Sequence, residues 1–507
     1  MAKALVLEFG EDAPALREVT NIDGCVFGCT TRWSWMGWVK GEDRLNWHSK
    51  RHMKEDVAIN PLFARGEEET VPRYKLPKEG LLPESAYQIV HDELTLDGSA
   101  RLNLATFVGT WMEPEAQKLY VEAANKNMID KDEYPQTAAI EERCLRIIAD
   151  LWNAPDPLHS IGVSTTGSSE ACMLGGLALK RRWQLARRQQ GKLVDRPNIV
   201  FSSAVQVVWE KFATYFEVEP RYVDIAPERP YLTPEGVADA VDENTIGVVP
   251  ILGVTYTGSY EPVQAIAQAL DELERRTGLS VPIHVDAASG GFVAPFLQED
   301  LIWDFRLPRV HSINTSGHKY GLVYPGLGWV LWRHQDLLPQ DLVFNVSYLG
   351  GSMPTFGLNF SRPGAHVLLQ YYNFLRLGKQ GYYMVQKTCQ DVAHFLAREI
   401  GAMEPFELLT DGSDLPVFAW RKKPGYNERW SLEDLSFMLR ERGWQVPAYP
   451  LPPTMQDITI MRVVVRNSFS MDMAHLFLDD FKRAVAHLEG LEQPFPKALR
   501  QETTFHH

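Results

Sequence analysis

Short apolar segments alternate with helical segments through the middle of the chain, and this alternation constrains the fold more than any other feature. Strands are predicted for "PNIVFS" (197–202), "TIGVVPIL" (245–252), "VPIHVDAA" (281–288), "VHSINTS" (310–316) and "GLGWVLWR" (326–333). Helical periodicity is seen in "SEACMLGGLALKRRWQLARRQQGK" (169–192), "QVVWEKFATYF" (206–216) and "VQAIAQALDELERRTG" (263–278). Buried strands separated by helices indicate an α/β fold with a mostly parallel sheet.

The chain has 507 residues, which is more than one hydrophobic core usually supports, so several domains are expected. A long helical segment over 364–401 is followed by strand segments at 416–422 and 458–466 and a helix at 474–488. We therefore divide the chain into three parts. They are an N-terminal segment (1–101), a large domain (102–389) and a small C-terminal α/β domain (390–507).

Composition narrows the class of protein further. The formal net charge of −14 argues against a general nucleic-acid or membrane surface. The five cysteines imply no disulfide framework, and Cys25 and Cys29 lack the paired motif of a zinc site, so no metal is expected. No apolar run is long enough for a membrane helix, and the first residues lack the features of a signal peptide. A cytoplasmic enzyme fits these properties.

Three chemical groups fall at the predicted strand ends, where open α/β sheets bind their ligands. Asp286 ends the strand segment "VPIHVD", and Lys319 follows the next one in "SINTSGHKYGL". "TTGSSE" places Gly167, Ser168 and Ser169 at the start of a long helix, whose free N–H groups and dipole favour a phosphate. Each signal alone is weak, since a "GSS" before a helix is more often only a cap.

Together, the three groups describe the requirements of pyridoxal phosphate. This cofactor needs a lysine for a Schiff base, an acid facing its pyridinium nitrogen and an anion site for its phosphate. A buried lysine is easier to deprotonate and therefore more nucleophilic. Small residues around Lys319 leave room for a cofactor, Ser316 and His318 are further candidates for the phosphate, and Ala288 is small enough to lie under the ring.

Longer motifs resemble glutamate decarboxylase, a group II pyridoxal-phosphate decarboxylase. They include "HVDAASGGFVAPF" (284–296), "WDFRLPRVHSINTSGHKYGLVYPGLGWVLWR" (303–333), "NKNMIDKDEYPQTAAIE" (125–141), "GSSEACMLGG" (167–176), "LNLATF" (102–107) and "NFSRPGAHV" (359–367). The resemblance covers roughly residues 70–507 and implies a fold-type I pyridoxal-phosphate enzyme. It also implies a homodimer or larger homo-oligomer with the active site at a subunit interface.

The resemblance assigns roles residue by residue. For the cofactor it implies Lys319 as the covalent anchor, Asp286 at the pyridine nitrogen, and Ser168, Ser169, Gln206, Thr255, Ala288, Ser316, His318, and a neighbouring subunit's Phe360 and Ser361. For the substrate it implies Arg462 at the α-carboxylate, with Thr106 and Phe107 on a loop from the second subunit and Asn127 and Asp130 nearby. Tyr348, in "VSYLGG", matches a mobile-loop tyrosine that supplies a proton to Cα.

The two ends of the chain depart from the family pattern. About 52 residues before Met53 have no match, and they are either a start-site artefact or a lineage-specific arm. His507 is a candidate cap of the active site at neutral pH. The tail lacks a basic, tryptophan-bearing extension, so calmodulin is not expected as a partner.

The expected reaction is conversion of L-glutamate to 4-aminobutanoate (GABA) and carbon dioxide. One alternative is a related group II decarboxylase for another amino acid, and another is a non-catalytic pyridoxal-phosphate-binding protein. The motifs "LNLATF" and "NKNMID" favour glutamate, and retention of Lys319, Asp286 and Tyr348 favours an enzyme.

Overall fold

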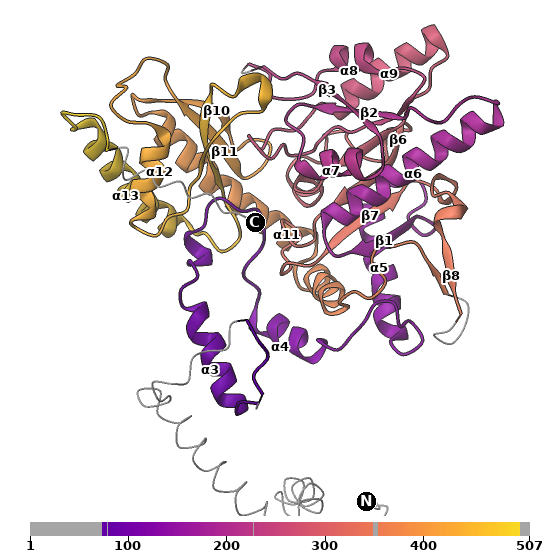
Figure 1. Ribbon diagram of the computed structural model, residues 1–507, viewed down its shortest axis with the longest axis horizontal. Coiled ribbons are helices and arrows are strands. Elements are labelled where there is room, and N and C mark those ends of the chain that lie inside the picture. Colours follow the sequence, from indigo (N-terminus) through magenta and orange to yellow (C-terminus); the bar gives the residue numbers. More distant parts are fainter. Residues whose placement is uncertain (1–73, 79, 227, 348–352, 497–507) are drawn as a thin grey trace, which may run out of the picture. The chain divides into compact units, whose positions relative to one another are not determined.

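The computed structural model describes residues 74–78, 80–226, 228–347 and 353–496 (Figure 1). The chain divides into two compact units, Met1–Asp97 and Gly98–His507. The described part of the first unit contains one helix, α3 (Pro83–Leu94). Cys25, Cys29, the segment before Met53, Tyr348 and His507 lie outside the described residues.

A seven-stranded sheet organises the second unit, in the order β1-β7-β6-β5-β4-β2-β3 (Figure 1). Its strands are β1 (Ile161–Thr165), β2 (Asn198–Ser202), β3 (Glu219–Val223), β4 (Thr245–Val248), β5 (Ile283–Asp286), β6 (Val310–Thr315) and β7 (Gly328–Trp332). Only β7 runs against its neighbours β6 and β1. The predicted α/β fold with a mostly parallel sheet is therefore confirmed.

The helices of this part of the chain are α4 (Pro114–Glu122), α5 (Pro135–Leu151), α6 (Ser168–Gln189), α7 (Val207–Tyr215), α8 (Pro234–Ala240), α9 (Val263–Thr277) and α10 (Ala294–Leu297). Among them, α5, α6, α7 and α8 contact strands of the sheet directly. Helix α6 lies across β1, β4, β5, β6 and β7 (Figure 1). Because α6 touches so much of the sheet, its first turn has a well-defined position relative to the ends of β5 and β6.

A second, four-stranded antiparallel sheet follows, in the order β10-β11-β13-β12. It is built from β10 (Phe406–Asp411), β11 (Val417–Lys422), β12 (Ala448–Pro450) and β13 (Thr459–Val464), with α12 (Leu432–Arg440) and α13 (Met471–Glu489). Helix α11 (Ala365–Gly401) runs between the two sheets in the sequence and contains the predicted domain boundary at 389–390. A small hairpin, β8 (Phe344–Val346) with β9 (Met353–Thr355), precedes it.

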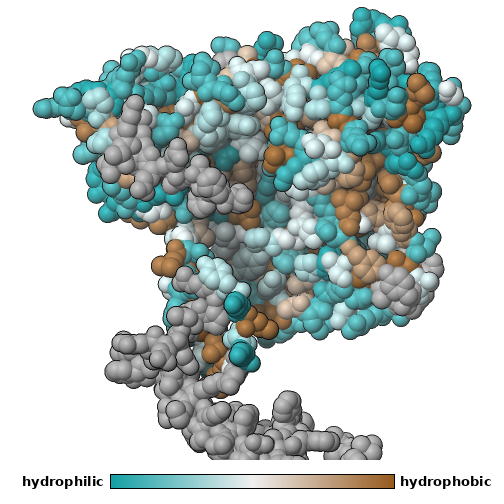
Figure 2. Space-filling view, viewed as in Figure 1, coloured by the Kyte–Doolittle hydropathy of each residue, from teal (hydrophilic) through white to brown (hydrophobic). Residues whose placement is uncertain are grey.

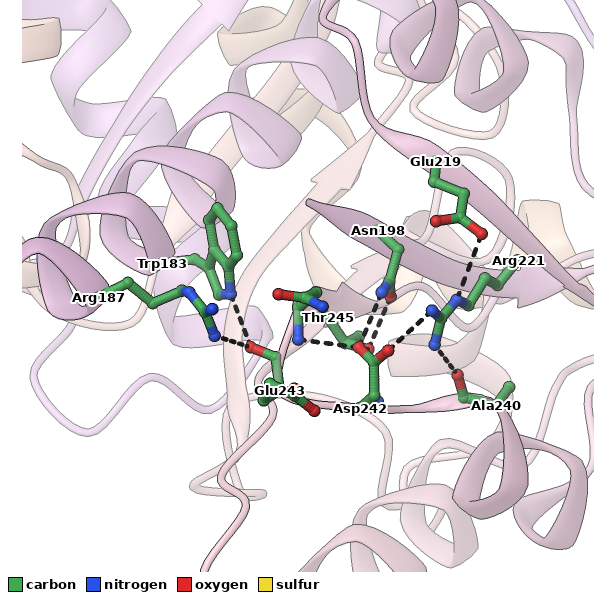
Figure 3. A network of polar contacts seen from close by, with 10 residues as sticks. Trp183, Arg187, Asn198, Glu219, Arg221, Ala240, Asp242, Glu243 and Thr245 are labelled. Atoms are coloured by element: carbon green, nitrogen blue, oxygen red, sulfur yellow. Dashed lines mark hydrogen bonds and ion pairs between the residues drawn. The ribbon is translucent and has the colours of Figure 1, made fainter. Parts of the chain in front are cut away.

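A polar network fixes the far end of α6, as Figure 3 shows. The Trp183 indole and the Arg187 guanidinium both donate to the backbone carbonyl of Glu243, at 3.1 and 2.9 Å. The neighbouring Asp242 carboxylate accepts from Asn198 of β2 and Arg221 of β3, each at 2.8 Å. The loop before β4 therefore joins α6 to two strands of the sheet.

Two buried carboxylates hold the segment before α11 against β1 and α6. Glu141 of α5 accepts from the Ser164 backbone N–H at 3.0 Å and from the Arg362 guanidinium at 3.1 Å. Both charged side chains are almost fully buried, with 8% of Glu141 and 5% of Arg362 exposed. Glu170 of α6 similarly accepts from the Thr166 and Asn359 backbone N–H groups, at 2.8 and 3.1 Å.

Removing the Glu141 charge is expected to destabilise the protein strongly. In Glu141→Gln the buried Arg362 guanidinium loses its carboxylate partner, which typically costs about 3–5 kcal/mol. Its neighbour Glu142, which pairs with Arg146 on the surface, is a matched control. We expect Glu142→Gln to change the free energy of unfolding by less than about 0.5 kcal/mol. Urea unfolding measures both, and equal losses would contradict the importance of the buried pair.

Candidate active site

A cavity of about 330 Å³ opens at the carboxyl ends of β5 and β6, beside the first turn of α6. Nine residues predicted from the sequence line it: Ser168, Ser169, Gln206, Thr255, Asp286, Ala288, Ser316, His318 and Lys319. Among residues near it that had not been predicted are Trp209, Asn314, Cys172, Ser289 and His284. The structure thus brings the predicted lysine, acid and hydroxyls together in one place.

Lys319 lies in the turn that follows β6 and is enclosed by the protein. Its Nζ donates a long hydrogen bond of 3.4 Å to Ser289 Oγ and lies 5.2 Å from the centre of the Phe107 ring. Burial lowers the pKa of Lys319, and the charge on Arg462 lowers it further, while Asp286 and Cys172 act in the opposite direction. A larger share of the amine is therefore uncharged and nucleophilic than in an exposed lysine.

Asp286 ends β5 with an array of hydrogen-bond donors around its carboxylate. Oδ2 accepts from the Trp209 indole N–H at 2.9 Å and from the more distant Cys172 thiol at 3.6 Å. Oδ1 accepts from the Asn314 amide at 3.0 Å and from the Ala288 N–H at 3.1 Å. These four hydrogen bonds fix the orientation of the carboxylate at the edge of the cavity that it lines.

The opposite wall of the cavity is a turn with small residues and hydroxyls. Gly167 precedes α6, and a Cβ at this position would lie 3.2 Å from the His318 ring, so a glycine lets the turn approach the histidine closely. Burial lowers the pKa of His318 to about 4. Its Nδ1 accepts from the Leu327 N–H at 3.2 Å, which leaves Nε2 as the protonated nitrogen of the neutral ring.

These residues fit pyridoxal phosphate. The cavity volume is within the range of small-molecule sites. Ser316 Oγ, in its lining, is buried and has no hydrogen-bond partner within the described chain, as expected of a hydroxyl whose acceptor is a ligand. An acid at the strand end, a buried lysine and a helix N-terminus with two serines match the three ends of the cofactor.

Arg462 and Phe107 form a second layer beside the lysine. The Arg462 guanidinium, on β13, lies 4.8 Å from the centre of the Phe107 ring and donates to the backbone carbonyls of Thr255 and Ala105. Its Nε is buried and has no partner among the described residues. The sequence placed Phe107 in a second subunit's site, whereas here it lies beside Lys319 of its own chain. Hydrogen bonds from Gly109 to His318 and from Val464 to Leu104 hold this loop.

The remaining predicted residues lie apart from this cavity's lining. Asn127 donates to Ser361 Oγ at 3.3 Å and accepts from the Arg362 N–H at 3.1 Å. Asp130 lies one turn away in the same loop, and its N–H donates to the Asn127 carbonyl. Phe360 precedes Ser361 and is 40% exposed. Thr106 caps its own loop by accepting from the Val108 N–H.

Comparisons with known proteins identify the family. Residues 72–423 match the model of the pyridoxal-dependent decarboxylase conserved domain. Glutamate decarboxylase of Aliivibrio fischeri is 52% identical over 86% of this chain and 94% of its own. Glutamate decarboxylase beta of Listeria monocytogenes is 50% identical over 85% of this chain and 94% of its own. The solved Lactobacillus brevis glutamate decarboxylase has a TM-score of 0.82 and 47% identity, covering 85% of this chain and 99% of its own.

The chain belongs to the pyridoxal-dependent decarboxylase family, and its cofactor is pyridoxal phosphate. Within the part of the chain that the structure describes, no helix has the length and apolar character needed to cross a membrane. No cluster of metal-ligating side chains is found among those same residues.

Lys319→Ala is expected to abolish covalent attachment of the cofactor. The purified variant should show no protein-bound pyridoxyl group after borohydride reduction, because no other lysine is found among the described residues that line the cavity. Lys211→Ala, at an exposed position on α7, serves as a control that should still be labelled at the level of the unaltered chain. Labelling of Lys319→Ala at another lysine would contradict the assignment.

Proposed function

We propose that this protein decarboxylates L-glutamate at the α-carbon, giving 4-aminobutanoate and carbon dioxide. The observation that carries the proposal is the arrangement of three residues around one cavity. Lys319 is buried, the Asp286 carboxylate is surrounded by hydrogen-bond donors, and the Arg462 guanidinium lies beside the same Phe107 ring as Lys319. The names of the relatives, which are about half identical over most of the chain, support glutamate as the substrate.

Bound pyridoxal phosphate supplies an electron-accepting ring that takes up the electrons of the breaking bond between Cα and the carboxylate. Asp286, whose carboxylate is held in place by four donors, would face the pyridine nitrogen of the cofactor. Lys319 would attach the cofactor covalently. Ser168 and Ser169, with Ser316 and His318, would hold its phosphate, while Gln206, Thr255 and Ala288 would lie beside its ring.

Arg462 provides the cation for a substrate carboxylate. Two of its nitrogens are already held by backbone carbonyls, so the guanidinium is oriented before substrate arrives. The Phe107 ring covers both Arg462 and Lys319 and thus limits access of water to the reacting atoms. We assign the side-chain carboxylate of the substrate to the N–H groups and polar side chains around Thr106 and Asn127, with Asp130 nearby. The proton delivered to Cα is assigned to Tyr348.

We also propose that the protein acts in the cytoplasm as a homodimer or larger homo-oligomer, with Phe360 and Ser361 completing a neighbouring subunit's site. Neither residue lines the cavity of its own chain. Phe344, Leu358 and Phe360 expose 66%, 46% and 40% of their surface, and Figure 2 shows hydrophobic side chains gathered on this part of the molecule near β8. Exposed aromatic and aliphatic side chains so close in the sequence are typical of an interface.

Substrate choice is tested by release of carbon dioxide from carboxyl-labelled glutamate, aspartate, tryptophan and 3,4-dihydroxyphenylalanine. We expect release from glutamate alone, and Arg462→Ala should lower kcat/KM by about 100-fold or more, since a charged hydrogen-bonded contact is lost. Arg421→Ala, a control on the neighbouring strand β11, should change it by less than about twofold. Release from another amino acid but not from glutamate would select the related decarboxylase. Cofactor binding without turnover of any substrate would favour the non-catalytic alternative.

Shared sites are tested by mixing two inactive variants. If Ser361 serves the neighbouring subunit, Lys319→Ala and a Ser361→Trp variant should regain activity when unfolded together and refolded. In a mixed dimer one site then carries both intact residues, so about a quarter of the unaltered activity is expected from random pairing. Each variant refolded alone should stay inactive. A mixture no more active than its parts would contradict the interface site.

A further inference from the structure

Four polar residues form a compact group on one face of the two central strands. The register of β5 and β6 places His284 opposite Ser312 and Asp286 opposite Asn314. Side chains two residues apart on a strand point to the same face, so all four lie together against α6. All four are almost fully buried. Polar groups at such positions are retained only if their hydrogen bonds are satisfied.

The hydrogen-bond directions in this group follow from its one fixed acceptor. The Asp286 carboxylate accepts from the Asn314 amide nitrogen, so the Asn314 oxygen faces the other way, toward His284 Nε2 at 2.8 Å. His284 Nε2 must then carry the proton. Its Nδ1 is left as an acceptor, 2.7 Å from the Ser312 hydroxyl, which donates to it. The order is therefore Ser312 to His284 to Asn314 to Asp286.

Asn314 also reaches the opposite wall of the cavity. Its amide nitrogen, which has two protons, donates to Ser168 Oγ at 2.6 Å as well as to Asp286 Oδ1 at 3.0 Å. Because Ser168 Oγ accepts this bond, its own proton remains available to donate to another group. The Asn314 side chain thus orients both the Asp286 carboxylate at the end of β5 and the Ser168 hydroxyl at the start of α6.

The packing around His284 keeps this arrangement in a single state. The ring lies edge-on to Trp209, with ring centres 5.3 Å apart. A Cβ on Gly175 of α6 would come within 2.3 Å of the imidazole, so glycine is required where the helix crosses it. Burial lowers the pKa of His284 to about 4. The imidazole therefore stays neutral, with one donor and one acceptor, at ordinary pH.

We propose that Asn314 is a positioning residue for pyridoxal phosphate, held in its working orientation by Ser312 and His284. It fixes the Asp286 carboxylate and the Ser168 hydroxyl relative to each other. The residue proposed for the pyridine nitrogen is therefore held at a set distance from the residue proposed for the phosphate. The inference rests on the proposed function only in requiring that pyridoxal phosphate occupies this cavity. Without the His284 N–H, the buried Asn314 oxygen has lost its donor, and only the bonds to Asp286 and Ser168 still orient the amide.

The test compares His284→Leu with His284→Gln in the full-length protein. Glutamine has an N–H where the histidine Nε2 lies, whereas leucine fills the space without a donor. We expect the Leu variant to bind pyridoxal phosphate about 10-fold or more weakly, because the buried Asn314 oxygen is left without a donor. The Gln variant should bind the cofactor with an affinity within about threefold of that of the unaltered chain. The pH at which the absorption band of the bound cofactor changes should shift in the Leu variant alone.

Both readouts are made without glutamate, so they separate this inference from the choice of substrate. An unaltered chain that binds no pyridoxal phosphate would overturn the proposed function as well. Leu and Gln variants with equal affinity and equal absorption would overturn only the role of Asn314. If His284→Leu does not fold, Ser312→Ala replaces it and should weaken cofactor binding by about threefold or more. Ser436→Ala removes a hydroxyl that donates to a backbone carbonyl in the small domain, and it should leave cofactor binding unchanged. Equal affinities of these two serine variants would also contradict the proposal.

Discussion

The register between β5 and β6 is the constraint on which the site depends. It sets Asp286 beside Asn314 at the point where the two strands end, and the turn after β6 then carries Ser316, His318 and Lys319 into the same cavity. A shift of one residue would turn Asp286 to the opposite face of the sheet, away from α6 and its serines. The buried hydrogen bonds between the strands' side chains oppose such a shift, since each would be lost without replacement by water.

Several parts of the chain converge on the lysine through this frame. Helix α6 carries the serines, and the network around Asp242 and Glu243 fixes its far end to β2 and β3. The loop before α4 brings Phe107 over Lys319, and β13 of the second sheet supplies Arg462. The cofactor site is built on the large sheet, while the groups proposed for substrate come from more distant segments. Substrate preference can therefore change with little effect on cofactor binding.

Much of the fold and cofactor site was predictable because the signals are local. The apolar strands β2, β4, β5, β6 and β7 were found, and nine predicted residues line the cavity. β3, an edge strand with the sequence "EPRYV", was missed because its side chains are only partly buried and show no apolar run. The roles of Asn314, His284 and Trp209 depend on strand register and helix placement, which are long-range properties. The local sequence indicates these roles only through the polar residues at every second position in "HVD" (284–286) and "SIN" (312–314).

We propose that Asp286, oriented by its neighbours, keeps the pyridine nitrogen of the cofactor protonated. This role is tested most directly by the nitrogen NMR signal of the protein reconstituted with pyridoxal phosphate carrying 15N in its ring. We expect the chemical shift of a pyridinium in the unaltered chain, well above the pH at which the free cofactor loses this proton, and that of an unprotonated pyridine in Asp286→Ala. A pyridine shift in the unaltered chain at neutral pH would contradict the account.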